Sequence, residues 1–165
     1  MKKKSAAITT ERLVLRGFRK NDFADLARFA RDKMASNAAR CDSPWPTDDK
    51  GIKAALRVFM KDGAWFAVQL REGPVVGFVV ANRTQVESVR NLGYAIRTDY
   101  QNRGYAYEAC AAVLAHCKGE GVTQFISTTA DELEFSVKLL KKLGFVEKES
   151  LAGGEFAATR FEITL

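Results

Sequence analysis

The sequence predicts an α/β (α+β) fold, in which a mixed, mostly antiparallel central sheet of six to seven strands is flanked by about four helices. One observation is periodicity, because short segments alternate apolar and polar residues and longer ones repeat apolar residues at helical spacing. The second is a turn: the letters REGP at 71–74 join two strands as a hairpin, which makes that pair antiparallel. The third is a strand–helix–strand unit over 92–128, which requires a right-handed crossover between parallel strands.

The N-terminal half is predicted to form one strand and two helices before the hairpin. The letters RLVLRGF at 12–18 read as a strand, and Asn21 is placed to cap the helix that follows. The second helix begins at Thr47 or Asp48, in a loop with two prolines at 41–49. The hairpin strands cover 64–70 and 74–82, and the helical stripes are Phe23, Leu26, Ala27, Ala30 and Met34, then Ile52, Ala55, Leu56, Phe59 and Met60.

The C-terminal half alternates strands with helices. The strand at 92–96 leads into a helix that ends near Gly119 and Gly121. A strand, a helix closed by Gly144 and two last strands around the letters LAGGE complete the chain. These later elements cover 123–128, 132–143, 145–150 and 155–164, and the stripe of the first helix is Ala106, Ala109, Cys110, Val113, Leu114 and Cys117.

A chain of 165 residues, of which 47% are hydrophobic, is large enough for a single domain over 1–165 with its own core. Its apolar runs are all shorter than the roughly 20 residues that a membrane span needs. The lysine-rich start, MKKKSAAITTERL, lacks the apolar stretch of a secretory signal, and residues 1–7 are expected to be a flexible arm.

Cysteine, histidine and charge limit the classes of function. Three unclustered cysteines argue against a disulfide framework, and a single histidine argues against a metal site. We therefore expect a cytoplasmic protein without a metal. The basic residues behind the net charge of +6 are scattered through both halves, which does not favour a nucleic-acid partner. The positive charge is also consistent with binding of a small polyanionic ligand.

The segment DYQNRGYAYEACAAVLAHC at 99–117 starts a helix with glycine where a capping Ser, Thr or Asp is usual. The N–H groups at a helix start lack partners and favour anions, and Gly104 would let a phosphate approach the backbone closely. Gln101 and Arg103 add side-chain donors beside the turn, and Ala106 is small. The letters fit neither a dinucleotide fingerprint nor a nucleotide-triphosphate loop. From the turn alone, an anion site and an ordinary tight turn both remain open.

Four stretches of the chain, in order, resemble one family. Gln101-x-x-Gly104-x-Ala106, between a strand ending in GYAI and an alanine-rich helix, is similar to the acyl-CoA pyrophosphate loop of the GNAT superfamily of N-acetyltransferases. TERLVLRGFRKNDFADL at 10–26 resembles the opening strand and helix of the ribosomal-protein N-terminal (Rim-type) branch. The letters VVGFV resemble the third strand, and SVKLLKKLGFVE resembles the closing helix and strand. The resemblance covers nearly the whole chain.

The resemblance implies that acetyl-CoA binds between two splayed parallel strands, here 92–96 and 123–128. The pantetheine arm would bond to the backbones of Tyr94 and Ile96, near which the thioester carbonyl would also be polarised. Gly93 is expected to mark a bulge that opens the strands. The pyrophosphate would take the N–H groups of the turn formed by Gln101, Asn102, Arg103, Gly104, Tyr105 and Ala106.

The reaction that the resemblance implies is direct attack of a free amine on acetyl-CoA, without an acyl-enzyme, so Cys41 is not favoured as a nucleophile. Ser136 matches the serine of the family pattern and shares a helical face with Leu133 and Leu140, so its hydroxyl is expected to face inward and serve the leaving thiolate. A bond back to its own helix is the alternative. Both leucines are departures: an Asn usually stands at position 133, and the tyrosine that is the general acid in many relatives would fall at position 140.

The general base is not identified by the sequence. Related sequences often have Glu where this chain has Asn91, and the candidates Glu87, Glu108, Glu132 and Glu155 also read as ordinary surface carboxylates. An α-amine with a pKa of about 7.7–8 is partly neutral at pH 7, whereas a lysine is almost fully charged, which favours an α-amine or a small polar amine as acceptor. The acceptor is expected beside the first two helices and the last hairpin, against a wall of Trp45 and either Phe66 or Phe156.

The sequence therefore predicts an N-acetyltransferase that moves the acetyl group of acetyl-CoA directly to a primary amine, either a protein N-terminal α-amine or a small-molecule amine. A non-catalytic acyl-CoA-binding sensor is the alternative that the departures leave open, and a protein with an RNA-binding basic surface is a third. The expected partners are acetyl-CoA and an amine acceptor, without a membrane, and the expected state is a monomer or weak homodimer.

Overall fold

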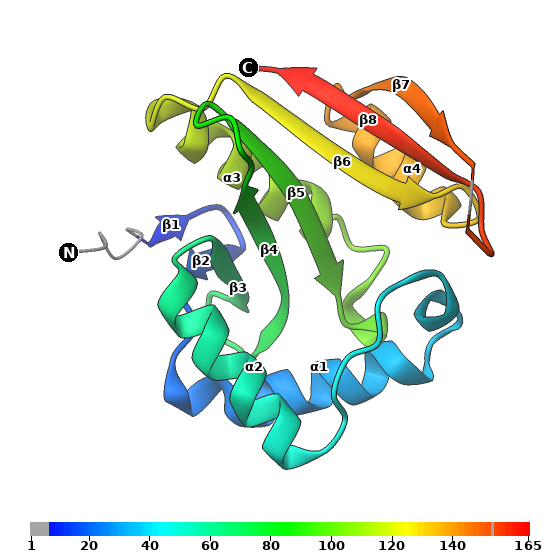
Figure 1. The fold of residues 1–165 in the computed structure, drawn as a ribbon. Coiled ribbons are helices and arrows are strands. Elements are labelled where there is room, and N and C mark those ends of the chain that lie inside the picture. The colour runs from blue at the N-terminus through cyan, green and yellow to red at the C-terminus, as the bar shows by residue number, and fades with distance from the viewer. Residues whose placement is uncertain (1–6, 153) are drawn as a thin grey trace.

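The computed structural model describes residues 7–152 and 154–165, so the arm expected at residues 1–7 lies, apart from residue 7, outside the described part. The described residues form one eight-stranded sheet in the order β1-β2-β3-β4-β5-β6-β8-β7, flanked by four α-helices (Figure 1). Every neighbouring pair of strands is antiparallel except β5 and β6, which are parallel. The strands are β1 (Ile8–Thr9), β2 (Leu13–Arg16), β3 (Trp65–Leu70), β4 (Val75–Arg83), β5 (Val89–Ile96), β6 (Gln124–Ala130), β7 (Val146–Leu151) and β8 (Ala158–Thr164); the helices are α1 (Phe23–Ala35), α2 (Asp49–Asp62), α3 (Tyr105–Gly119) and α4 (Glu134–Lys142), with short 3-10 segments η1 (Lys20–Asp22), η2 (Asn37–Cys41) and η3 (Thr98–Tyr100).

The predicted fold class is confirmed, with one strand more than expected. The additional strand is β1, whose two residues pair with β2. A segment that short has no periodicity for a sequence pattern to detect. The strands β3 and β4 form the predicted antiparallel hairpin, and α3 joins the predicted parallel strands. Strand β5 begins earlier than expected, at Val89, because the polar residues before position 92 already pair with β4.

The helices divide into two pairs, one on each face of the sheet. Helices α3 and α4 cover a core that includes Val79, Phe125 and Phe161, whereas α1 and α2 cover a second core rich in aromatic rings. Successive residues of β4 alternate between the two, since Val79 belongs to the first core and its neighbours Phe78 and Val80 belong to the second. The two pairs of helices therefore cover both faces of the sheet over its central strands.

The start of α1 differs from the prediction. Asn21 lies inside η1 and does not cap the helix; the residue that flanks α1 is Asp22. The Asp22 carboxylate accepts a hydrogen bond from the Arg19 N–H at 2.7 Å and two from the Arg16 guanidinium, both at 2.8 Å. The side chains of Arg16 and Asp22 are each only 7% exposed. The buried arginine requires a carboxylate at this position, and the cap predicted at Asn21 is therefore wrong.

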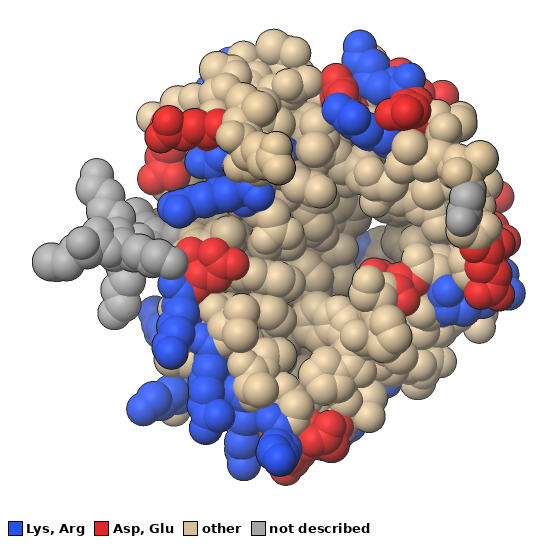
Figure 2. All heavy atoms as spheres, in the orientation of Figure 1, with Lys and Arg blue, Asp and Glu red and all other residues tan. Residues whose placement is uncertain are grey.

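Positive charge gathers along α2. Lys50, Lys53, Arg57 and Lys61 are all exposed and recur at helical spacing, so they share one outer face of the helix. Figure 2 shows basic side chains as a band along the outside of the α1–α2 layer. The basic residues are thus less evenly scattered than expected from the sequence.

The parallel strands β5 and β6 are paired only where they begin. Their ladder joins 89–91 to 124–126 and stops there. Beyond it β5 stays with β4 as far as Ile96, and β6 stays with β8 as far as Ala130, so the two strands diverge into a V (Figure 1). At the point of the V, the Ser127 Oγ donates a hydrogen bond to the Leu92 carbonyl at 3.0 Å. The splayed parallel pair expected from the sequence is confirmed.

The bulge expected at Gly93 is absent. Strands β4 and β5 pair in a continuous register, with Gly93 opposite Val80. The V opens instead because each strand keeps its antiparallel neighbour while the sheet twists. The glycine that the backbone does require is Gly77, where a Cβ would lie 2.1 Å from the Ala95 carbonyl oxygen.

We expect Gly77→Ala to lower the free energy of unfolding by about 1–3 kcal/mol, because the added methyl group would collide with a backbone oxygen of β5 and the two paired strands would have to shift apart. Urea denaturation measures this difference. Gly119→Ala is the matched control, since no atom lies within 4 Å of a Cβ placed there, and its stability should be unchanged or slightly higher. Equal stability of Gly77→Ala and the wild type would contradict the close approach of β4 and β5.

Candidate active site

The edges of the V carry backbone groups that have no sheet partner. The Leu92 carbonyl points toward β6, as its hydrogen bond from Ser127 demonstrates. Main-chain groups alternate in direction along a strand, so those of Tyr94 and Ile96 point the same way, while the Arg97 N–H bonds to β4. The two residues that were expected to bind pantetheine through their backbones therefore face the opening.

The turn after β5 presents a row of N–H groups. Asn102 and Gly104 both have positive φ angles, of 58° and 81°, and Gly104 precedes the first residue of α3 without any side-chain cap. Successive N–H groups in such a conformation point into one concavity. Among the residues that the structure describes, none accepts a hydrogen bond from the backbone N–H groups of residues 102–106. Exposed donors of this kind at a helix N-terminus are suited to an anion.

The side chains of the turn hold its shape. The Gln101 Nε2 donates to the Ile96 carbonyl at 2.7 Å and so ties the turn to the end of β5. The Arg103 guanidinium donates to the Asp99 carbonyl at 3.0 Å and lies over the Tyr100 ring, 5.4 Å from its centroid. Each of these two side chains thus makes a hydrogen bond that holds the turn in shape, beside the exposed N–H groups of the main chain.

A second support for the turn comes from the N-terminal strands. The Arg12 guanidinium donates to the Arg103 carbonyl at 2.8 Å and to Glu108 at 2.7 Å. Glu108 also accepts hydrogen bonds from the Thr10 hydroxyl at 2.6 Å and the Arg12 N–H at 2.9 Å. Burial by itself would raise the pKa of Glu108, but these hydrogen bonds together outweigh it and lower the pKa. Glu108 is therefore a charged brace for the turn and is poorly suited to accept a proton.

Ser136 and Tyr94 meet across the open side of the V. Ser136 lies in the first turn of α4 and is 8% exposed. Its Oγ is 2.7 Å from the Tyr94 Oη, which also lies 3.3 Å from the Ser136 carbonyl oxygen. Burial raises the pKa of Tyr94. The Ser136 hydroxyl faces inward, as its helical position predicts, and its partner is a tyrosine of β5 instead of its own helix.

The positions that depart from the family pattern have structural roles. Leu133 flanks the start of α4, and Leu140 is fully buried in the core beneath that helix. Of the candidate bases, Glu132 forms an ion pair with Arg40 at 2.5 Å, whereas Glu87 and Glu155 are exposed. None of the described carboxylates forms a hydrogen bond with the Tyr94–Ser136 pair, so the structure brings no base to these hydroxyls.

The aromatic wall predicted for the acceptor side is only partly present. Trp45 is half-buried in the core under α1 and α2, where it stacks on Phe78 with ring centroids 5.4 Å apart. Phe66 is buried on the opposite face of the sheet, edge-on to His116 at 6.0 Å, so its assignment to this wall is wrong. The cause is the alternation of β3, in which Trp65, and not Phe66, lies on the face of α1 and α2.

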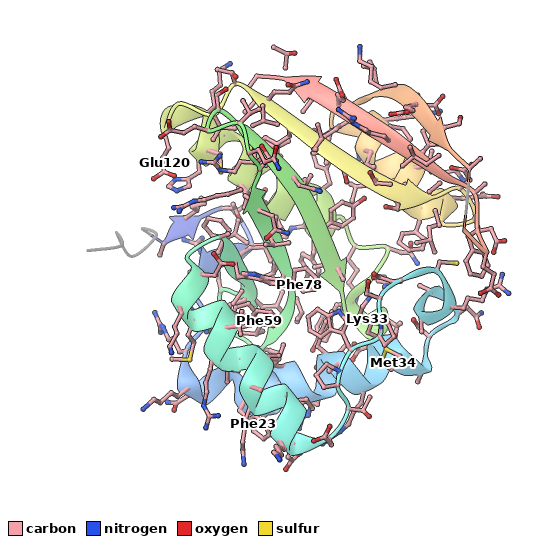
Figure 3. The ribbon with its side chains drawn as sticks, in the orientation of Figure 1. Phe23, Lys33, Met34, Phe59, Phe78 and Glu120 are labelled. Atoms are coloured by element: carbon pink, nitrogen blue, oxygen red, sulfur yellow. The ribbon has the colours of Figure 1, made fainter. Side chains whose placement is uncertain are left out.

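The loop that carries Trp45 is fixed to the end of α1. The Met34 Sδ accepts a hydrogen bond from the Trp45 N–H at 3.3 Å, and Lys33 forms an ion pair with Asp42. Figure 3 shows Lys33 and Met34 at this end of α1, with Phe78 between the helices and the sheet. The loop is thereby held against the α1–α2 layer.

Phe156 lies where loops from the two halves of the chain meet. Arg40 of η2 lies over the Phe156 ring, 5.5 Å from its centroid, and pairs with Glu132. These contacts join η2 to the segment before α4 and to the loop between β7 and β8. Figure 2 shows a deep hollow at the centre of the molecular face beside this junction, and its walls carry few charged side chains.

The described residues bear on the requirements for a membrane span, a metal site and a reactive thiol. They contain no helix that is both long and apolar enough to cross a membrane, and no group of three or more His, Cys, Asp and Glu side chains that could hold a metal ion. Cys110 and Cys117 are buried in the core, as predicted, and Cys41 is partly exposed. Burial raises the pKa of the Cys110 thiol and raises that of Cys117 to about 11, so both remain protonated near neutral pH.

Sequence reasoning missed two side chains of this site. Tyr94 was selected for its main chain, although the alternation along β5 places its ring on the same face as Leu92 and Ile96, toward α3 and α4. That alternation was a usable signal. No sequence signal connects Arg12 to the turn, because the partners Arg12 and Arg103 are 91 positions apart.

Comparison with known proteins identifies relatives over most of the chain. Residues 12–146 match the family model described as an acetyltransferase (GNAT) domain. An uncharacterized N-acetyltransferase, YnaD, of Bacillus subtilis (strain 168) is 30% identical over 140 residues, which cover 83% of this chain and 81% of that protein.

Solved structures share the fold at lower identity. RimL, a ribosomal L7/L12 alpha-N-protein acetyltransferase in complex with coenzyme A, superposes with a TM-score of 0.86 at 13% identity, over 97% of this chain and 98% of that one. A spermidine N-acetyltransferase from Vibrio cholerae, in complex with CoA and spermine, superposes with a TM-score of 0.78 at 17% identity, over 94% and 96% of the two chains.

We expect Glu108→Gln to lower the free energy of unfolding by about 1–2 kcal/mol at pH 7, because an amide accepts weaker hydrogen bonds from Arg12 than a carboxylate does. The pKa of Glu108 is lower in the folded chain than in the unfolded one, so its stabilising effect is complete above the unfolded value of about 4.3 and disappears as pH falls through the folded value.

The difference between variant and wild type should therefore be constant from about pH 8 to 5 and shrink below about pH 4. Urea denaturation at a series of pH values measures it. Glu87→Gln, at an exposed carboxylate without an ion pair, is the control and should show little difference at any pH. A penalty for Glu108→Gln that persisted unchanged at about pH 2 would contradict the pKa assignment.

Proposed function

This chain belongs to the GNAT acetyltransferase family, and we propose that it transfers the acetyl group of acetyl-CoA directly to a primary amine in a ternary complex. The observation that carries the proposal is the row of backbone N–H groups at residues 102–106, for which no described residue supplies an acceptor. A diphosphate supplies several acceptors at the spacing of consecutive amides, and its charge is favoured by the N-terminus of α3.

In this proposal, coenzyme A lies along the V. The diphosphate binds the turn of Gln101, Asn102, Arg103, Gly104, Tyr105 and Ala106 through the main chain, with Gln101 and Arg103 holding the loop in shape. The pantetheine arm takes the place of a sheet strand beside β5, where the main-chain groups of Tyr94 and the Ile96 N–H face the opening. This arrangement places the thioester near the point where Ser136 and Tyr94 meet.

The chemistry requires a neutral amine, a polarised carbonyl and a stabilised leaving group. The nitrogen of the amine attacks the thioester carbon, the N–C bond forms, the C–S bond breaks, and the proton lost by nitrogen ends on sulfur. A backbone N–H of β5 polarises the carbonyl. Ser136 donates a hydrogen bond to the leaving sulfur, because its hydroxyl faces inward and has no acceptor among the described residues other than Tyr94.

The acceptor class rests on the pKa of the amine. Neither the sequence nor the described residues identify a general base, so in this proposal the amine binds in its neutral form, and a low pKa favours an α-amine or a small polar amine over a protein lysine. The relatives described as acting on an α-N-protein substrate and on a polyamine support both acceptor types. The acceptor enters from the hollow beside η2 (Figure 2).

We assign the enzyme to the cytoplasm, in keeping with its unpaired cysteines, and expect a monomer or weak homodimer. A non-catalytic acyl-CoA-binding sensor remains the alternative, but no observation in the structure favours it, and the relatives reported above are all described as acetyltransferases.

We expect Gly104→Asp to weaken CoA binding by at least about 100-fold, because a carboxylate would stand against the diphosphate. Gly104→Asn is the matched control: it imposes the same side-chain size at a φ of 81° without the charge, and it should bind CoA clearly more tightly than the Asp variant. Calorimetric titration with CoA measures binding, and thermal melting shows that each variant is folded. Normal binding by Gly104→Asp would overturn the assignment of the turn.

We expect kcat/KM for a peptide with a free α-amine to rise about tenfold per pH unit and to level off near the pKa of that amine, about 7.7–8, since no protein base intervenes. For an N-blocked peptide with one lysine, the rate should be far lower and still rising at pH 9. Thiol release from acetyl-CoA measures both, with the N-blocked peptide without lysine as the blank. A common plateau near pH 6 for both acceptors would instead indicate a protein general base.

A further inference from the structure

The hydroxyl groups of Tyr94 and Ser136 form a pair that the proposed transfer does not by itself explain. Tyr94 comes from β5, one arm of the V, and Ser136 comes from α4, which packs on the same face of the sheet as the Tyr94 ring. Their oxygens are 2.7 Å apart. A strand and a helix that are 42 positions apart in the chain are therefore joined at the place where the thioester sulfur is expected.

The available protons and acceptors limit which of the two hydroxyl groups donates the hydrogen bond between them. Each hydroxyl has one proton to donate. Either Ser136 donates to the Tyr94 oxygen, with Tyr94 turned toward the Ser136 carbonyl at the longer distance of 3.3 Å, or Tyr94 donates to the Ser136 Oγ at 2.7 Å. In the second arrangement the Ser136 proton has no acceptor among the described residues and is available to a ligand. An anion beside Ser136 selects this second arrangement, because each hydrogen bond in such a chain strengthens the next.

The surroundings keep the pair neutral. Burial raises the pKa of Tyr94, which disfavours loss of its proton to a thiolate. The nearby Cys110 is itself buried and protonated, and no described carboxylate or cationic side chain bonds to either hydroxyl. Leu140, where a tyrosine would supply an ionisable acid, is fully buried and apolar. This site is therefore built to stabilise a negative sulfur through a chain of neutral donors.

We propose that Tyr94 is a positioning residue that directs the Ser136 hydroxyl onto the leaving sulfur of coenzyme A. As the C–S bond breaks, its electron pair moves to sulfur, which accepts a hydrogen bond from Ser136, while Ser136 accepts one from Tyr94. Both side chains keep their protons, and the proton that completes the CoA thiol comes from the attacking amine. This inference rests on the proposed acetyl transfer and assigns a role to a side chain within it.

The test uses Tyr94→Phe, which keeps the ring and removes only the hydroxyl. We expect kcat to fall about tenfold, while KM for acetyl-CoA stays within about twofold, since the lost hydrogen bond forms fully only with a charged sulfur. Ser136→Ala should lower kcat at least as much. The double variant should be no slower than Ser136→Ala, because Tyr94 acts only through Ser136. Tyr107→Phe, at an exposed tyrosine under the Lys142 ammonium, is the matched control and should leave kcat unchanged.

A second measurement does not depend on turnover. The ultraviolet absorbance of the thiolate, read against a desulfo-CoA blank, reports the pKa of the CoA thiol while it is bound. We expect this pKa to be about one unit lower in the wild type than in Tyr94→Phe or Ser136→Ala. A purely structural role for Tyr94 would change the melting temperature and not this pKa.

The outcomes separate the two proposals. Absence of thiol release by the wild type with every amine would contradict the proposed transfer. Normal turnover, combined with an unchanged kcat or an unchanged bound-thiol pKa in Tyr94→Phe, would overturn the role of Tyr94 and leave the transfer standing. An additive loss in the double variant would also overturn it, because it would mean that Tyr94 acts independently of Ser136.

Discussion

The parting of β5 from β6 is the constraint on which the rest of the structure depends. A sheet strand normally satisfies its main-chain groups on both edges, and an interior strand that loses one neighbour leaves polar groups that need another partner. Here the ladder stops after residues 91 and 126, because β5 follows β4 and β6 follows β8. At the point of the V, Ser127 of β6 bridges the two strands with its side chain. The chain thereby prepares a place for an extended, hydrogen-bonding ligand in the middle of its own sheet.

The turn after β5 extends this opening in the same direction. It combines a glycine in the left-handed region with a helix start that has no side-chain cap, and both features leave N–H groups exposed. If this turn were flexible, ordering it around a ligand would cost conformational entropy. Gln101 ties it to β5, and Arg12 with Glu108 ties it to the N-terminal strands, so the donors are already arranged before a ligand arrives.

The two faces of the sheet have different chemistry. On the face of α3 and α4, the ring of Tyr94 passes between β5 and α4 and ends in the hydroxyl pair with Ser136. On the face of α1 and α2, aromatic rings around Trp45 and Phe78 form an apolar layer with little hydrogen-bonding capacity. In the proposed reaction, the site lies between these two faces, where the V opens in the sheet. An acyl donor held on the first side and an amine arriving from the second would thus meet in line, as direct transfer requires.

The sequence by itself determined the order and type of the four helices and of every strand except β1, the parallel crossover and the turn at Gly104, because these follow from local periodicity and from the freedom of glycine to adopt a positive φ. It also placed the Ser136 hydroxyl on an inward helical face. Only the tertiary structure decided that Tyr94 is its partner, that Arg12 braces the turn, that Phe66 lies on the face of α3 and α4, and that Gly77 lies against the backbone of β5 while Gly93 forms no bulge. Each of those facts depends on which distant segments become neighbours and on their register, and a pattern confined to adjacent residues carries no information about either.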